Sequence, residues 1–323
     1  MPAVNSAHRL LLSLPFAVVA ACSGGNSAEA PPPPTPGVEV TPDNAVDVAN
    51  LTLRTAFAMA DFAELAARFE KVLIPLPPEP PETPAPAVLT AVAEHPALQT
   101  VLAASLSTIV FGPEGGQVLY AWEDRDDDEV VTPGDSFVAS FSGYGERGKL
   151  FQGIVTMEIV ETFGLPRLNG WARGRMTFVD TSVSIDFVPL PFAGSVLFER
   201  ERRPGVDLLH VDVDNGIQIE DGVLEPGSTL DVLYYPFFGE ALFYSAAGSV
   251  TGDTLTGSVP FATDLAFNGY TFLPDPISGV MTMLGAGDAV IEANMLNAST
   301  LRIRTDVDGD GEFEESVDTV WPL

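Results

Sequence analysis

From Gln117 onward, apolar and polar residues alternate with a period of two, in short runs separated by turn residues. Such alternation is typical of antiparallel strands with one buried face and one solvated face. One run places Phe151, Val155, Met157 and Ile159 on a face opposite Gln152, Thr156 and Glu158. Two later runs give the apolar set Ala289, Ile291, Ala293, Met295, Leu301 and Ile303, with Asp288, Glu292, Asn294, Arg302 and Arg304 on the other face.

Turn signals recur along this region and set the expected architecture. They include GYGERGK, FGLPRLNG, EPGS and DVDGDG, and the whole chain has 29 Gly and 28 Pro. Roughly a dozen strands joined by tight turns predict a mainly β fold, a large antiparallel meander that is barrel-like or folded into a sandwich. No Gly-rich loop follows a strand and opens a helix, which argues against a nucleotide-binding α/β fold.

A helix is expected ahead of the strands, over residues 41–74. Thr41 is a good N-cap, Pro42 suits the first helical position and Asp43 suits the first turn. We expect one apolar stripe to pack on the main domain, with a partner-binding coiled coil as the alternative. The stripe is Leu51, Thr55, Ala58, Phe62, Leu65, Phe69 and Val72.

Two Pro-rich segments divide the chain. APPPPTPG and PLPPEPPETPAPA read as spacers that hold their neighbours apart. A short helical piece near residues 87–106 is expected to lead into the strands. The predicted organisation is a signal peptide over 1–21, a tether over 22–40, the helix over 41–74, a linker over 75–88 and an antiparallel β domain over 89–323.

The start of the chain carries a targeting signal. Arg9 precedes the apolar run LLLSLPFAVVAAC, which is too short to span a bilayer as a helix. Its end, Val19-Ala20-Ala21-Cys22, resembles the lipobox of bacterial lipoproteins. The resemblance implies cleavage before Cys22, attachment of a lipid with two acyl chains to its thiol, often a further acyl chain such as palmitate on the new amine, and an anchored mature protein. The alternative is an ordinary secretory signal with an incidental cysteine.

Composition removes several classes of function. Cys22 is the only cysteine, so a lipidated chain has neither a catalytic thiol nor a cysteine metal site. With 45 acidic and 15 basic residues the formal net charge is -30, which repels phosphate backbones and argues against nucleic-acid binding. Three histidines, one of them in the signal peptide, leave no multi-histidine zinc site.

The stretch WEDRDDDEVVTPGDSF is the first of two candidate calcium loops. Asp124, Asp126 and Asp128 take positions one, three and five of a pattern that resembles the EF-hand loop, and Asp135 takes position twelve. Glu129 stands where that pattern has glycine, and the flanks look like strands. A plain acidic turn is the alternative.

The second candidate loop is DVDGDGEFE near the C-terminus. It resembles the calcium loops set in β-hairpins of integrin α propellers, and Gly311 stands where that pattern has glycine. The resemblance implies one carbonyl ligand, from Glu312, and carboxylate ligands from Asp306, Asp308, Asp310 and Glu314. A solvated hairpin turn is again the alternative, because turns favour the same residues.

Two short blocks raise a hydrolase hypothesis. Gly134-Asp135-Ser136-Phe137 resembles the nucleophile block of GDSL hydrolases, and Asp207 with His210 matches their Asp-x-x-His block. Strand alternation would put Asp207 and His210 on opposite faces, and the Gly-x-Asn-Asp block of that family is absent. We therefore predict a non-enzymatic protein and keep the serine hydrolase as the third hypothesis.

The chain as a whole resembles Gram-negative envelope lipoproteins that end in an acidic hairpin and a Trp-containing strand, here DVDGDGE and VWPL. That resemblance implies location and architecture but no activity. We expect a protein anchored by its lipid in the cell envelope, at the outer membrane facing the periplasm or the surface, with a binding or structural role and calcium-stabilised hairpins. The aromatic run YYPFFGEALFY supports the alternative, a carrier of a hydrophobic ligand in a curved-sheet cavity. The predicted partner is the membrane, through the N-terminal lipid, and the sequence does not identify a protein or an apolar ligand as a further partner.

Overall fold

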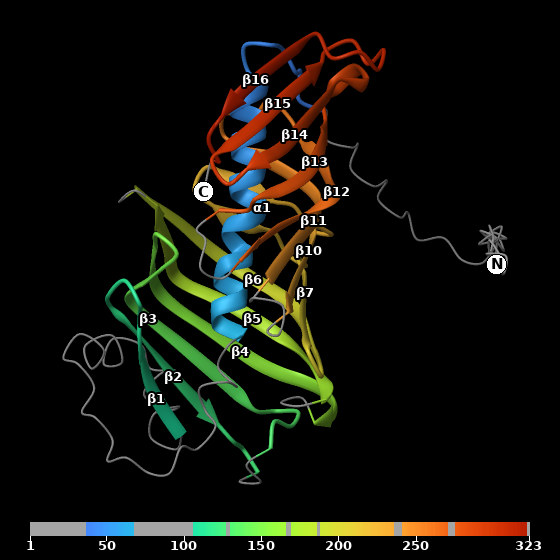
Figure 1. Ribbon diagram of the computed structural model, residues 1–323. Helices are drawn as coiled ribbons and strands as arrows, with labels where there is room; N and C mark the ends of the chain where they lie inside the picture. Colours follow the sequence, from blue (N-terminus) through green and yellow to red (C-terminus); the bar gives the residue numbers. More distant parts are fainter. Residues whose placement is uncertain are drawn as a thin grey trace, which may run out of the picture. The chain divides into compact units, whose positions relative to one another are not determined.

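The computed structural model describes residues 37–67, 106–126, 130–165, 169–185, 188–235, 241–270 and 275–321, and Figure 1 shows their arrangement. These residues form one 16-stranded antiparallel sheet and one α-helix, α1 (Ala45–Ala67). The predicted fold, mainly β with a large antiparallel meander and an N-terminal helix, is confirmed.

The strands follow one another in the sheet in the order in which they follow one another in the chain. Their bounds are β1 Leu106–Phe111, β2 Gln117–Glu123, β3 Ser136–Glu146, β4 Lys149–Leu165, β5 Asn169–Ile185, β6 Val188–Arg203, β7 Val206–Asp212, β8 Ile217–Ile219, β9 Gly222–Leu224, β10 Thr229–Tyr235, β11 Ala241–Gly252, β12 Val259–Tyr270, β13 Ser278–Leu284, β14 Val290–Asn297, β15 Thr300–Asp306 and β16 Glu315–Thr319. β1 precedes the region in which we predicted strands.

One apparent branch in the sheet is a pair of interrupted strands. β7 and β8 both pair with β6, and β10 and β9 both pair with β11. The segments between them are joined by backbone hydrogen bonds, from Val213 N to Ser228 O (2.9 Å) and from Gly227 N to Val213 O (2.8 Å). β7–β8 and β9–β10 are therefore two neighbouring strands, each broken once, and the meander continues through them.

The predicted strand faces agree with the burial of the side chains. All ten apolar residues named above for the three runs are buried, and the polar residues between them are half-buried or exposed. Alternation of side chains across a pleated strand accounts for this, because each strand turns one face to a common core and the other to solvent.

α1 lies along the apolar face of the sheet, where it contacts β9, β10, β11, β12, β14 and β15 (Figure 1). In its last turn, Leu65 O accepts a hydrogen bond from the Tyr120 hydroxyl of β2 (2.9 Å). Between Leu51 and Asp61 every residue except Arg54 is buried. The predicted stripe thus accounts for only part of the buried surface, since Leu53 and Met59 on other faces are as buried as its described members. Those members are Leu51, Thr55, Ala58 and Leu65, while the burial of Phe62, Phe69 and Val72 lies outside what the structure describes.

The start of α1 differs from the expected cap. The helix begins at Ala45, after a turn in which Thr41 O accepts hydrogen bonds from Asn44 N and Ala45 N. The side-chain contact comes from Asn44, whose Oδ1 accepts a hydrogen bond from Thr41 N (2.8 Å). The Asn44 side chain therefore reaches back to the Thr41 backbone, as the third residue of a capping box does, while Thr41 supplies the carbonyl that accepts the first i+4 bond.

Several expectations fall outside the described residues. They concern the signal peptide, Cys22 and the tether up to residue 36, together with the Pro-rich linker and most of the helical piece near 87–106. Of the helix that is described, no stretch has the length and hydropathy needed to cross a membrane.

Candidate functional site

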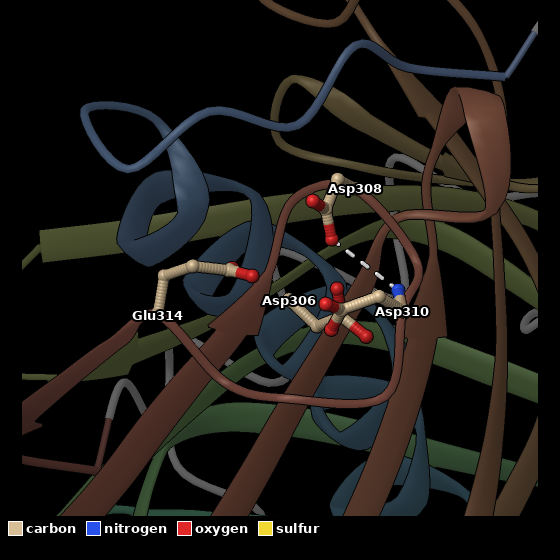
Figure 2. Close-up of side chains that lie close together, drawn as sticks. All are labelled: Asp306, Asp308, Asp310 and Glu314. Atoms are coloured by element: carbon tan, nitrogen blue, oxygen red, sulfur yellow. Dashed lines mark hydrogen bonds between the residues drawn. The ribbon is translucent and has the colours of Figure 1, made fainter.

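The loop between β15 and β16 gathers four of the predicted calcium ligands. Carboxylate oxygens of Asp306, Asp308, Asp310 and Glu314, one from each residue, all lie within 4.8 Å of one another. Figure 2 shows the four carboxylates directed toward the middle of the loop. A set of hard oxygens at this spacing is the kind of arrangement that calcium requires.

Asp306 anchors the loop. It is the last residue of β15 and is 3% exposed, and its two carboxylate oxygens accept hydrogen bonds from Gly309 N (2.7 Å) and Gly311 N (2.9 Å). Both glycines have positive φ, 72° and 93°, a conformation that a side chain would strain. A carboxylate has about four lone-pair sites, so these two bonds leave Asp306 further capacity to accept.

The remaining carboxylates also hold the backbone of the loop. Asp308 Oδ1 accepts from Asp310 N (3.3 Å, dashed in Figure 2), Asp310 Oδ1 from Glu312 N (2.8 Å) and Glu314 Oε2 from Val307 N (2.8 Å). Residues 306–314 include five acidic residues and no basic one. Hydrogen bonds from neutral amides offset only part of the repulsion among these charges, and a divalent cation would offset more.

Glu312 is placed differently from the other four. Its carboxylate is not part of the cluster, although it is exposed in the same way as Asp308, Asp310 and Glu314. This position is compatible with the predicted carbonyl ligand, because a residue that ligates through its backbone need not direct its side chain inward.

The β2–β3 loop brings together a smaller group. Oxygens of Asp124, Asp126 and Asp135 lie within 4.8 Å of one another, while the fourth predicted ligand, Asp128, lies outside the described residues. Asp135 is fully buried and accepts hydrogen bonds from Thr132 N (2.9 Å), Arg125 N (3.1 Å) and Trp122 Nε1 (3.4 Å). This carboxylate holds the loop together, whether or not an ion is bound.

The serine and the histidine of the hydrolase hypothesis lie on strands well separated in the sheet. Ser136 begins β3 and His210 is in β7, with β4, β5 and β6 between them. At about 4.8 Å per strand this separation is about 19 Å. The Ser136 hydroxyl donates to Glu123 Oε2 (3.0 Å), and Asp207 pairs with Arg200 (2.6 Å). The described residues therefore do not bring a serine and a histidine into contact here.

His210 instead belongs to a row of charges on the outer face of the sheet. Its Nδ1 lies 2.7 Å from Asp231 Oδ1 and its Nε2 lies 3.2 Å from Asp212 Oδ1, and Glu199 is its register partner on β6. Partial burial lowers the pKa of His210, but the hydrogen bonds and charges of Asp231 and Asp212 outweigh that effect, so the pKa is raised.

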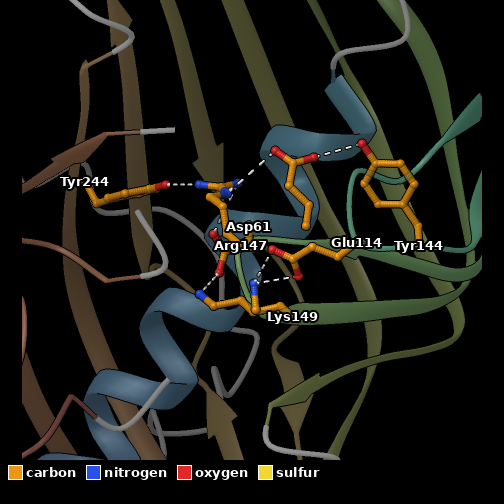
Figure 3. Close-up of polar contacts among 8 residues, drawn as sticks. Asp61, Glu114, Tyr144, Arg147, Lys149 and Tyr244 are labelled. Atoms are coloured by element: carbon orange, nitrogen blue, oxygen red, sulfur yellow. Dashed lines mark hydrogen bonds and ion pairs between the residues drawn. The ribbon is translucent and has the colours of Figure 1, made fainter. Parts of the chain in front are cut away.

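A buried ionic cluster near the C-terminal end of α1 was not predicted. The β3–β4 turn, Arg147-Gly148, has φ of 56° and 72° and sends Arg147 and Lys149 toward Asp61 of α1 (Figure 3). Lys149 is one of only two lysines in the chain, the other being Lys71. That rarity, next to a tight GERGK turn, is the one sequence signal that could have drawn attention to the cluster.

Comparison with known proteins gives no relative from which a role could be transferred. No protein-family model, no curated protein and no solved structure matches the chain.

Proposed function

We propose that this chain is a lipid-anchored protein of the cell envelope with a non-enzymatic binding or structural role, in which calcium stabilises hairpin loops of a large sheet. The observation that carries the calcium part is the β15–β16 loop, where four carboxylates converge within 4.8 Å on a buried anchor, Asp306. The lipobox-like Val19-Ala20-Ala21-Cys22 supports the anchor.

The role we assign to the ion is mechanical. The loop joins β15 to β16, and β16 is the last strand in the order of the sheet. Among the strands that the structure describes, β16 pairs only with β15, in a register that runs from Leu301↔Thr319 to Thr305↔Glu315. The acidic side chains repel one another in the loop that joins the two strands. An ion bound there would offset this repulsion and so fix the register of β15 and β16 at the loop end of the pair.

The alternative, a carrier of a hydrophobic ligand, requires space on the apolar face of the sheet. α1 occupies that face and buries Leu53, Met59 and Leu65 there, each at most 1% exposed. For this reason we favour the structural role over the carrier.

Thermal unfolding of a soluble chain starting at Val38 tests the calcium part of the proposal. After EDTA treatment, 5 mM calcium should stabilise the fold by about 1–2 kcal/mol if the dissociation constant is about 0.1–1 mM. We expect Tm to rise by about 2–6 °C, and the same concentration of magnesium to have a smaller effect, because magnesium demands a stricter octahedral geometry.

The variant Asp308→Asn/Asp310→Asn should lose the calcium response. The matched control, Glu39→Gln/Asp253→Asn, removes two exposed charges elsewhere and should keep it. An unchanged Tm in calcium, or a response that survives in the loop variant, would refute the calcium part. The anchor is tested separately by labelling cells with radioactive palmitate, where incorporation should depend on Cys22.

A further inference from the structure

A row of apolar side chains crosses the outer face of the sheet near one end of its strands. The register places its members side by side on six neighbouring strands, and each lies two residues from the end of its strand, next to the β4–β5, β6–β7 or β10–β11 turn. At about 4.8 Å per strand the row is about 24 Å long. Its members, called the apolar row below, are Phe163, Trp171, Glu201, Leu208, Leu233 and Phe243.

The apolar row faces away from the core. Leu209, Val232 and Leu242, the neighbours in sequence of three of its members, are buried in the core, and successive side chains of a strand point to opposite faces. Phe163 is 67% exposed, and the other apolar members are half-buried. The rings of Phe163 and Trp171 stack with their centroids 6.1 Å apart. The outer face therefore carries an ordered apolar surface beside these three turns.

A second row, two residues further from the turns, is mostly charged. At about 3.4 Å per residue the two rows are about 7 Å apart. Arg173 connects them, because its guanidinium carbon lies 4.6 Å from the centroid of the Trp171 ring and it forms ion pairs with Glu161 and Glu199. The members of this charged row are Glu161, Arg173, Glu199, His210, Asp231 and Ser245.

The turn end of these six strands does not share the acidity of the chain. It comprises residues 160–165, 169–175, 197–210, 231–235 and 241–245, which hold five arginines and five acidic residues. Their formal net charge is zero, so the rest of the chain carries the whole net charge of -30. An anionic surface repels that remainder, whereas a surface of balanced charges can approach zwitterionic headgroups.

We propose that the apolar row rests on the surface of the bilayer that carries the lipid anchor. This inference depends on the envelope anchor proposed above and adds the face by which the sheet meets the membrane. Amphipathic surfaces enter the boundary between headgroups and acyl chains by about 5–10 Å, which matches the spacing of the two rows. The apolar row lies at this boundary, where tryptophan is favoured, and the charged row lies among the headgroups.

The length of chain ahead of the fold suits this contact. Residues 23–36 separate Cys22 from Gly37, the first described residue, and they span at most about 50 Å when fully extended. An anchor at Cys22 therefore keeps the sheet close to the bilayer. The effective concentration is then high, and a contact too weak to bind the free protein is still populated.

Trp171 reports the contact directly. Trp122 and Trp321 are buried, at 1% and 8% exposed, whereas Trp171 is a member of the apolar row. The chain from Cys22 onward is coupled through its only thiol to a maleimide phospholipid in phosphatidylcholine vesicles, with or without bromine on the acyl chains. We expect tryptophan emission to be lower in the brominated vesicles, and this difference to disappear in Trp171→Phe.

The variant Phe163→Thr/Leu208→Thr removes apolar surface from the row and keeps residues that suit strands. Its quenching by bromine should fall by at least about twofold, because two apolar side chains no longer leave water. The matched control is Phe111→Thr/Leu265→Thr, which changes side chains 63% and 56% exposed on β1 and β12, outside the row, and should be quenched fully. Circular dichroism confirms that each variant is folded.

Three results would overturn the proposal. They are equal emission in the two kinds of vesicle, quenching that persists in Trp171→Phe, and full quenching of the folded row variant. Chemical coupling replaces acylation in the cell, so failure here is distinct from failure of the anchor, which palmitate labelling tests.

Discussion

Lys149 and Asp61, 88 residues apart in sequence, form a buried ion pair that joins the β3–β4 turn to α1. The helix also packs on β9–β12, which lie further along the same sheet. The pair therefore connects two parts of the sheet through the helix that lies between them.

Replacing only one member of this pair should be strongly destabilising. Lys149→Met leaves the Asp61 carboxylate buried, with Arg147 at 3.8 Å as its remaining ion-pair partner among the described residues. We expect a loss of about 3–5 kcal/mol in the free energy of unfolding, and recovery of most of it in Lys149→Met/Asp61→Leu. Urea denaturation measures both values. A single variant as stable as the unmodified chain would show that the pair is of no importance to the fold.

Gly222 allows α1 to approach β9 closely. A Cβ at this position would lie 2.4 Å from Thr55 Oγ1 and 3.2 Å from Leu51 Cδ1, both on α1. Gly222→Ala should therefore push the helix outward and lower the free energy of unfolding by about 1–3 kcal/mol. Gly269→Ala is the control, because its Cβ would meet neighbours only at ordinary contact distances of 3.5 Å or more. Equal stability of the two variants would contradict this role for Gly222.

Stability should depend on pH through His210. Its pKa is raised in the folded state, so the imidazolium contributes stability fully below the ordinary value of about 6.5, and this contribution is lost as pH rises through the raised value. The side chain is 36% exposed, so the effect should stay below about 1 kcal/mol. The free energy of unfolding should be measured by urea denaturation between about pH 5.5 and 8.5, a range that begins below the ordinary histidine pKa of about 6.5 and ends above it. It should decline across this range, and the decline should be smaller in His210→Gln. Identical profiles for the two proteins would be the contrary result.

Two acidic residues of the β15–β16 loop should respond differently to neutralisation. Asp306→Asn should lower stability even in EDTA, by about 1–3 kcal/mol, because the buried carboxylate accepts from Gly309 N and Gly311 N. Glu312→Gln changes an exposed side chain outside the carboxylate cluster and should leave both the stability and the calcium response intact. Loss of the calcium response in Glu312→Gln would show that its side chain, and not its carbonyl, is the ligand.

The sequence was most informative where the determining interactions are local. The faces of β4, β14 and β15 could be predicted because a strand's period of two is visible in neighbouring residues. The clustering of Asp306, Asp308, Asp310 and Glu314 follows for the same reason, since nine consecutive residues of a turn cannot be far apart.

The sequence was least informative where contacts join distant segments. The apolar stripe of α1 is a local pattern, but the burial of Leu53 and Met59 depends on how many strands reach the helix. The Lys149–Asp61 pair joins a turn to a helix across 88 residues. Neither segment carries a pattern that specifies the other, so single-sequence periodicity could not have found the ionic cluster.

The meander topology has a consequence for the order of folding. Each strand pairs with its neighbours in the chain, so hairpins can form early, because the entropic cost of closing short loops is low. α1 is different, because its partners are mostly the late strands, and Phe57 packs against Trp321 at the far end of the described chain. α1 is therefore synthesised before most of the strands that cover its apolar surface. Docking of α1 is expected to be the slow, high-contact-order step, and the interval before it is when this chain is most exposed to aggregation.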